Sequence, residues 1–205
     1  MTRPVDERSR EELLERVVDY VLAHGVIDLA LRPLARAVGA SPRLLLYRFT
    51  SKDELVTQVV SRLRERQREL FERVRVQEGK TAIDACRAAW DIMSSPKMEP
   101  LFKLFIELYG LALKEPKRFA PFMRDAIGDW LKYIERPFLA AGHTRTDARA
   151  IATVVLAGYR GFMLDLCATH DRARIDRAVG IWLNSLGAIG GPKSLERARE
   201  RPSAS

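Results

Sequence analysis

Apolar residues recur at intervals of three and four along most of the chain, which is the spacing of amphipathic helices. The first such segment covers residues 8–24 and ends at Gly25. A long helix is predicted over residues 52–76, and further helices are predicted over residues 81–94, 98–113, 117–141, 144–169 and 172–188. The sequence has no Asn-Gly or Asp-Gly pair that would signal a β-hairpin. The pattern therefore predicts an all-α fold.

The sequence pattern of residues 29–52 predicts two short helices that are joined by a tight turn. The inner face of the first short helix is formed by Leu31, Leu34, Ala35 and Val38. Gly39 permits the turn because glycine tolerates a left-handed backbone. Ser41 is then a predicted N-cap, with Pro42 at the first helical position.

The second short helix is predicted to be about two turns long. Leu45 and Phe49, four residues apart, are expected to point inward. The outward side chains are then Arg43, Leu44, Tyr47 and Arg48. Ser51 is expected to cap the next helix, and Glu54 completes a capping-box pattern.

Charge distinguishes this stretch from the rest of the chain. Residues 29–52 contain no acidic residue, and their positive charges are Arg32, Arg36, Arg43, Arg48 and Lys52. The net charge of +8 is otherwise spread along the chain and by itself supports DNA binding only weakly. A compact helix-turn-helix with only positive charge suits a groove lined by phosphates.

Here the chain resembles the TetR family of bacterial transcriptional regulators. The matching residues are Leu34-Ala35, Gly39-Ala40-Ser41, Phe49 and Ser51-Lys52-Asp53-Glu54-Leu55. The resemblance implies an N-terminal three-helix DNA-binding domain over residues 1–52, closed by the start of the 52–76 helix. It also implies a larger helical effector-binding and dimerisation domain over residues 53–188. Residues 189–205 are predicted to form a flexible tail.

The resemblance implies a regulator, most often a repressor in this family, that binds double-stranded operator DNA as a homodimer. A small apolar or aromatic effector is expected to release it. The alternative is a helical small-molecule-binding protein with a non-functional DNA module. Leu46 is the observation behind this alternative, because the family usually has a tyrosine there; Tyr47 follows one residue later.

The outward face of the second short helix is expected to read base edges. An arginine can bind guanine through two hydrogen bonds, and an apolar side chain can contact a thymine methyl group. The flanking residues are expected to contact phosphates, partly through helix N-termini. The predicted DNA contacts are Arg32, Ser41, Pro42, Arg43, Leu44, Tyr47, Arg48, Thr50 and Lys52.

The last two predicted helices are expected to form a dimer interface, as a four-helix bundle around a twofold axis. The predicted interface residues are Ile151, Val154, Val155, Gly158, Phe162, Ile175, Val179, Trp182, Leu183 and Leu186. Packing within one chain is the alternative for the same stripes. Arg160 and Asp165 interrupt this apolar region, and they could pair with each other, with a partner subunit or with a charged ligand.

Aromatic residues gather in the middle of the chain and are candidates for lining an effector pocket. The predicted lining residues are Trp90, Met93, Phe105, Tyr109, Met123, Trp130 and Tyr159. Ordinary helical core is the alternative for each of them.

Catalytic and metal chemistry find no support in the sequence. His24, His143 and His170 are far apart, and the chain has no GxSxG, HExxH or phosphate-binding glycine loop. We expect no enzyme activity and no cofactor. Cys86 and Cys167 are predicted to be reduced thiols in apolar helices. No signal peptide is visible and the longest uncharged run is short for a membrane span, so a cytoplasmic protein without a membrane partner is expected.

Overall fold

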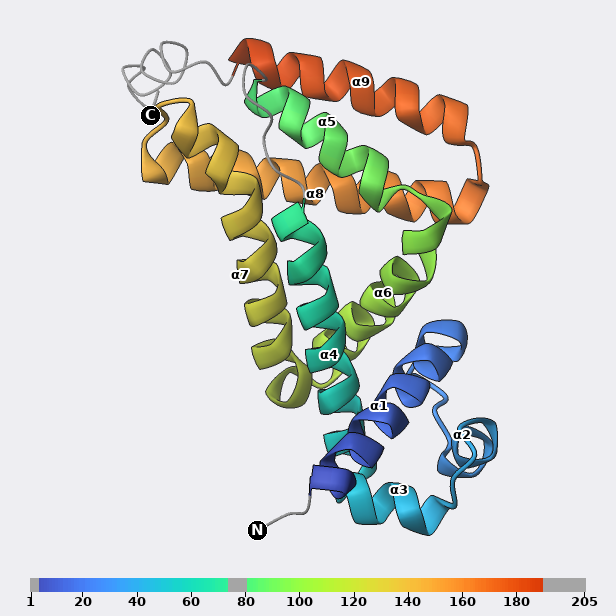
Figure 1. Ribbon diagram of the computed structural model, residues 1–205. Helices are drawn as coiled ribbons and strands as arrows, with labels where there is room; N and C mark the ends of the chain where they lie inside the picture. The colour runs from blue at the N-terminus through green and yellow to red at the C-terminus, as the bar shows by residue number, and fades with distance from the viewer. Residues whose placement is uncertain (1–3, 74–80, 190–205) are drawn as a thin grey trace. The chain divides into compact units, whose positions relative to one another are not determined.

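The computed structural model describes residues 4–73 and 81–189, and every regular element in these ranges is a helix (Figure 1). The α-helices are α1 (Pro4–His24), α2 (Leu31–Ala37), α3 (Pro42–Phe49), α4 (Lys52–Arg73), α5 (Ala82–Met93), α6 (Glu99–Lys114), α7 (Pro116–Ala140), α8 (Arg145–Thr169) and α9 (Arg172–Ile189). A 3₁₀ turn over Pro96–Met98 precedes α6. The predicted all-α fold is confirmed.

The helix boundaries follow the sequence pattern closely. α1 begins at Pro4, four residues before the predicted start. The helix predicted over residues 52–76 is described as far as Arg73, and its last three positions lie outside the described residues. The predicted tail also lies outside the described residues, apart from Ile189 at the end of α9.

The chain divides into two compact units. The first comprises Met1–Glu72 and Pro100–Met123, and so holds α1 to α4, nearly all of α6 and the start of α7. The second comprises Arg73–Glu99 and Arg124–Ser205, and so holds α5, the rest of α7, α8 and α9. This division is one of packing; the predicted functional boundary after residue 52 stays a prediction.

The core of the first unit is formed by the apolar faces of α1 to α4. Its most deeply buried side chains are Val17, Val18, Val21, Leu34, Leu45, Phe49, Leu55 and Val59. Polar contacts reinforce the packing of α4 on α1. The Arg62 Nε lies 2.6 Å from a carboxylate oxygen of Glu15, and Arg66 contacts the same carboxylate. These contacts fix α4 beside α1.

The second unit is built around α5, α8 and α9. Tyr159 of α8 is fully buried, and its hydroxyl donates a hydrogen bond of 2.5 Å to the carbonyl of Cys86 in α5. Trp90 of α5 is also buried, and its Nε1 donates to Asp176 Oδ1 of α9 at 2.9 Å. Burial raises the pKa of the Cys86 thiol to about 11, so that thiol is protonated at neutral pH.

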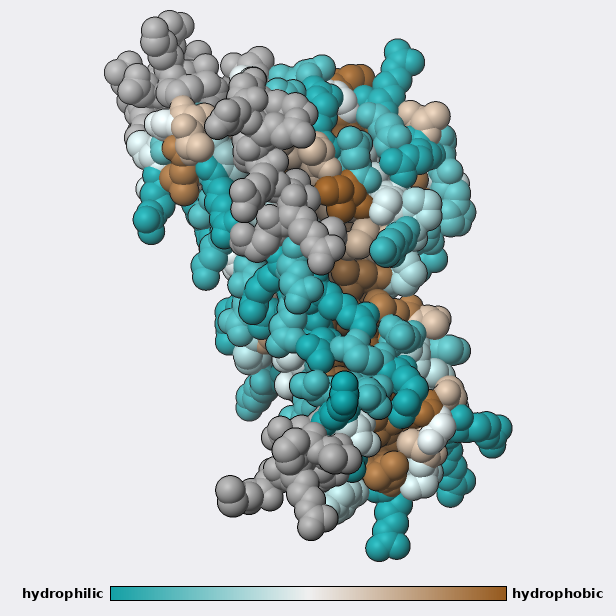
Figure 2. Space-filling view, in the orientation of Figure 1, coloured by the Kyte–Doolittle hydropathy of each residue, from teal (hydrophilic) through white to brown (hydrophobic). Residues whose placement is uncertain are grey.

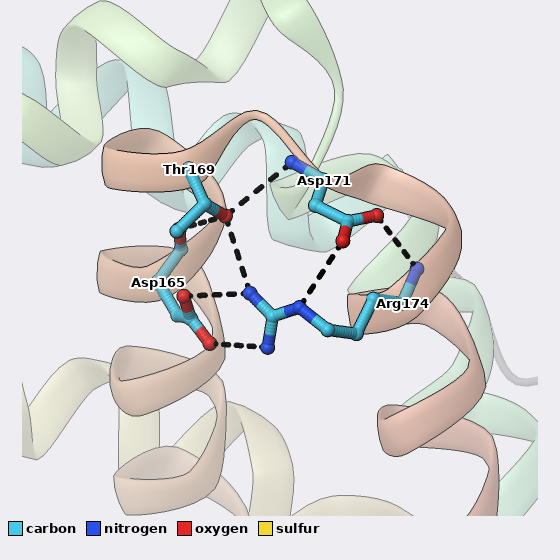
Figure 3. Close-up of polar contacts among 4 residues, drawn as sticks. All are labelled: Asp165, Thr169, Asp171 and Arg174. Carbon is cyan, nitrogen blue, oxygen red and sulfur yellow. Dashed lines mark hydrogen bonds and ion pairs between the residues drawn. The ribbon is translucent and has the colours of Figure 1, made fainter.

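An ion-pair cluster closes the corner between α8 and α9 (Figure 3). The two terminal nitrogens of Arg174 lie 2.8 and 2.9 Å from the carboxylate oxygens of Asp165. Arg174 also contacts Asp171, at 3.2 Å, and the Thr169 hydroxyl. These bonds hold the pKa of Asp165 below its ordinary value. The sequence pattern did not indicate Arg174, which binds Asp165 from the next helix.

Candidate nucleic-acid interface

The turn between α2 and α3 forms as the sequence predicts. Leu34 and Ala35 of α2 are buried against the core. Gly39 adopts a φ of +67°, and its position is open to solvent on the side where a Cβ would stand. The Ala40 N–H donates to the Ala35 carbonyl at 2.9 Å, which tightens the end of α2. The chain can then reverse direction and start α3.

α3 starts with the predicted cap. The Ser41 hydroxyl accepts a hydrogen bond of 3.1 Å from the Leu44 N–H, and a proline stands in the first turn. Leu45 and Phe49 are 0% and 1% exposed, so they fix the inner face of the helix. Their burial leaves the opposite face in solvent, where Tyr47 is 77% exposed.

The exit from α3 has one feature that the sequence does not signal. Thr50 has a φ of +62°, which is uncommon for a residue with a branched side chain. The chain turns there into α4, whose first turn is capped by Ser51: its hydroxyl accepts from the Glu54 N–H at 3.1 Å. Ser41 therefore caps the start of α3, and the backbone of Thr50 turns the chain at its end.

The predicted DNA contacts occupy one continuous stretch of the first unit. Seven of them are exposed: Arg32, Ser41, Pro42, Arg43, Leu44, Tyr47 and Thr50. Arg48 and Lys52 are half-buried, and the Arg48 guanidinium carbon lies 5.8 Å from the centre of the Tyr47 ring. Figure 2 shows apolar side chains among hydrophilic ones over α2 and α3. No carboxylate occurs in the sequence between Asp28 and Asp53, so this surface offers positive and apolar groups together.

Solved structures with a similar fold are known. A transcriptional regulator from Rhodococcus sp. Rha1 is 18% identical, with a TM-score of 0.73 over 88% of this chain and 97% of its own. A TetR transcriptional regulator from Legionella pneumophila is 13% identical, with a TM-score of 0.69 over 90% of this chain and 97% of its own. A TetR transcription regulator from Haloarcula marismortui is 16% identical, with a TM-score of 0.69 over 87% of this chain and 98% of its own.

The chain has the TetR fold. No protein-family model matches the sequence, and no curated protein matches it. At these identities the likeness establishes the fold, and the function rests on the residues of this chain. Leu46, where the family usually has tyrosine, is 42% exposed within the TetR fold, whereas Tyr47 beside it is far more exposed.

Four of the predicted dimer residues lie inside the second unit of the TetR fold. Their side chains are at most 2% exposed: Val155, Ile175, Val179 and Leu183. Of the others, Ile151, Gly158, Phe162, Trp182 and Leu186 are half-buried and Val154 is 47% exposed. These four side chains are covered by their own chain, and the predicted interface stays a prediction. Val155 lies on α8 and the other three lie on α9, and these two helices pack on each other within the chain.

A different face of α8 is exposed and carries no charge. It consists of Ala150, Thr153, Val154, Ala157, Gly161, Leu164 and Ala168. On α9, Ile181 is 63% exposed. By length and composition alone α8 could also cross a membrane, with a mean hydropathy of 1.5 in its most apolar window. The apolar character of α8 is therefore divided between a buried face and a solvent face.

The predicted pocket residues fall in both units of the TetR fold. Trp90, Met93, Trp130 and Tyr159 belong to the second unit, where each is buried. The polar atoms of two of them bond to their own chain, as described above for the second unit. Phe105, Tyr109 and Met123 belong to the first unit. Their role as lining of an effector pocket stays a prediction.

A small apolar cavity lies in the first unit among α4, α6 and α7. Leu63, Leu104, Phe105 and Phe122 are among its lining residues, together with Arg64, whose guanidinium carbon is 5.9 Å from the Phe122 ring centre. Phe105 is the one predicted pocket residue that lines it. The cavity measures about 10 Å³, which is about the space that one water molecule needs.

Glu107 on α6 makes a contact that the sequence pattern does not predict. Its carboxylate accepts hydrogen bonds from the N–H groups of Val26 and Ile27, at 2.7 and 3.3 Å, in the loop between α1 and α2. One signal could have drawn attention to this residue. Glu107 is the only acidic residue in the sequence between Glu99 and Glu115, in a helix that is mostly apolar.

Proposed function

We propose that this chain is a TetR-like transcriptional repressor that binds operator DNA as a homodimer and is released by a small apolar or aromatic effector. The observation that carries the proposal is the outward face of α3. Arg43, Leu44 and Tyr47 project from a capped helix whose opposite face is locked into the core. The surrounding stretch has no acidic residue, so phosphates meet no repulsion there.

The chemistry of this face suits direct reading of bases in the major groove. Arg43 is placed to bind guanine O6 and N7, and Leu44 to contact a thymine methyl group. Arg32 and Lys52, at the borders of the segment, supply charge for phosphates. Tyr47 is exposed enough to take the role of the family tyrosine that Leu46 replaces. A protein with these functions acts in the cytoplasm, where the chromosome lies.

Dimerisation gives the two copies of α3 the spacing that successive major grooves require, about 34–36 Å. We assign the dimer contact to the uncharged face of α8 around Val154, Gly161 and Leu164, together with Ile181 of α9. Small residues on this face allow close helix approach. A membrane-spanning role is disfavoured because α8 packs Tyr159 into its own unit and carries Arg160 in its length.

The effector site is assigned to the region of the small cavity among α4, α6 and α7. Its lining is apolar except for Arg64, which fits an apolar or aromatic molecule. α4 joins this region to the DNA-binding helices, since its first turn follows α3 directly. An effector that prefers one arrangement of α4 by about 5.5 kcal/mol would move the population from 1:99 to 99:1.

The test is a gel-shift titration at fixed salt with a duplex taken from the region upstream of the protein's own gene. Tyr47→Ala and Leu113→Ala form a matched pair, because both remove a large exposed side chain, 77% and 83% exposed respectively. Tyr47→Ala should weaken binding by roughly 1–3 kcal/mol, whereas Leu113→Ala should bind like the wild type.

A random duplex of the same length and composition is the reference for specificity. The proposal is contradicted if the wild-type protein binds both duplexes equally at every salt concentration. It is also contradicted if Tyr47→Ala and Leu113→Ala change the affinity by the same amount.

A further inference from the structure

The loop between α1 and α2 is held by a residue 81 positions later in the chain. Glu107 of α6 accepts the N–H of Val26 at 2.7 Å and the N–H of Ile27 at 3.3 Å through the same oxygen. Both N–H groups lie just past the end of α1. A carboxylate acceptor makes such bonds stronger than a neutral acceptor would.

Gly25 shows how closely Glu107 approaches this loop. The residue has a φ of +77°, and a Cβ at this position would clash with the Glu107 carboxylate. The backbone conformation favours glycine here, and an added Cβ would also have to displace the end of the Glu107 side chain. Val26 and Leu29 are both 5% exposed, so the loop is also anchored in the core on either side of the exposed Ile27.

A second charged contact lies at the other end of the α2–α3 pair. Arg118, in the first turns of α7, forms an ion pair with Asp53 in the first turn of α4. Asp53 follows the end of α3 by four residues. Arg118 is itself supported by Glu115, at 3.1 Å, at the corner between α6 and α7. The segment that carries α3 is thus contacted at its entry by α6 and at its exit by α7.

We propose that Glu107 is a positioning residue for the DNA-binding helices, fixing the entry to α2 and so the orientation of α3 from α6. This inference rests on the proposed DNA-binding function. α2 starts at Leu31, only four residues after Ile27, so a loop that loses its acceptor gives α2 and α3 a looser starting point. Arg118 contacts the exit of the same segment, so the proposed role of Glu107 concerns the entry.

The sign of the expected effect separates positioning from electrostatics. Removing a carboxylate from a DNA-binding protein reduces repulsion of phosphates, so electrostatics alone predicts tighter binding by Glu107→Ala. Positioning predicts weaker binding. Glu69→Ala is the matched control, since Glu69 is an exposed glutamate on α4. Glu107→Gln tests the hydrogen bonds separately, because the amide oxygen can still accept the two N–H groups.

The experiment measures two quantities on the full-length protein. Amide hydrogen exchange of Val26 and Ile27 by NMR reports the contact itself, and gel-shift titration with the upstream duplex reports DNA affinity. Glu107→Ala and Gly25→Ala should each speed exchange at these two amides about tenfold or more. Both should weaken DNA binding about tenfold, with an unchanged slope of affinity against salt.

Glu107→Gln should stay within about threefold of the wild type in DNA affinity, because the neutral amide oxygen still accepts the two hydrogen bonds that hold the loop. Glu69→Ala should bind equally or more tightly. Unchanged exchange in Glu107→Ala would overturn the inference, and so would faster exchange with wild-type affinity. If the wild-type protein fails to bind DNA although the exchange results are as expected, the proposed function has failed and the positioning role falls with it.

Discussion

The exposed apolar surface of α3 lies among positive charges, whereas that of α8 consists of uncharged residues. Around α3, Leu44, Leu46 and Tyr47 are exposed beside Arg43 and Arg48, within a stretch free of carboxylates. On α8 the exposed face is apolar or small and has no charge of either sign. Both surfaces are exposed, so packing within the chain does not explain why their residues are apolar.

This difference in charge indicates which kind of partner each surface suits. Phosphates require positive charge around any apolar contact, because counterion release provides much of the affinity for DNA. A protein interface instead excludes charge from its centre and allows close helix packing by small residues. The two surfaces therefore predict different responses to substitution, which the variants below test.

The largest effect is expected from a charge on the α8 face. Gly161 is exposed and a Cβ there meets nothing within 4 Å, so Gly161→Glu leaves the protomer intact. A carboxylate buried in a dimer without a partner costs about 3–5 kcal/mol. Sedimentation equilibrium should show the dimer dissociation constant rising about 100-fold or more. Gly128→Glu on α7, where the space is also open, is the control and should remain dimeric.

The α3 surface is tested by comparing two cations in it. Arg43→Ala should lose about 1–3 kcal/mol of affinity on the operator, mainly through one base pair. Lys52→Ala should weaken binding equally on all duplexes and lower the salt slope by about 1. Fluorescence anisotropy titrations with operator and scrambled duplexes distinguish the two patterns. Equal losses for Arg43→Ala on both duplexes would make Arg43 a phosphate contact.

Gly158 on α8 and Gly128 on α7 distinguish a packed helix position from an open one. A Cβ on Gly158 would clash with the Trp182 ring of α9, so Gly158→Ala should destabilise the protein by about 1–3 kcal/mol through overpacking. Gly128→Ala has open space and should instead stabilise its helix by up to about 1 kcal/mol. Urea unfolding at one fixed protein concentration measures both. If Gly158→Ala left the free energy of unfolding unchanged, α9 would have to be able to move away from α8.

The smallest effect is expected at the corner between α8 and α9. The pKa of Asp165 is lowered by Arg174, so its stabilising contribution is full above the ordinary value of 3.8 and is lost as the pH falls through the lowered pKa. Asp165→Asn should be less stable than the wild type at pH 7. The difference should vanish in strong acid and shrink in high salt, as thermal unfolding from pH 7 to pH 2 can show. A constant difference across that range would exclude the ion pair as its cause.

The α3 region was predictable from the sequence because its determinants act locally. Gly39, Ser41 and Pro42 each fix the backbone within a few residues, and the spacing of Leu45 and Phe49 fixes the buried side. The all-α fold was predictable for the same reason. The left-handed φ of Thr50 was not, because no glycine or asparagine marks that position.

The faces of α8 were not predictable in the same way. Periodicity shows that a helix has an apolar stripe, but α8 is apolar on two faces, and Val154 and Val155 are adjacent in sequence. Only packing decides that Val155 is covered by its own chain whereas Val154 is 47% exposed. Glu107 escaped prediction because its partners are distant in sequence and are backbone groups, which no residue pattern reveals.

The small size of the cavity among α4, α6 and α7 has a consequence for the affinity of an effector. Its volume of about 10 Å³ admits one water molecule, so an effector of drug-like size can enter only after side chains have moved apart. The observed dissociation constant then equals the intrinsic constant divided by the fraction of molecules already open. Substitutions that enlarge this space, such as Phe105→Ala or Phe122→Ala, would raise that fraction, and sensitivity to the inducing molecule would increase without any new contact to it.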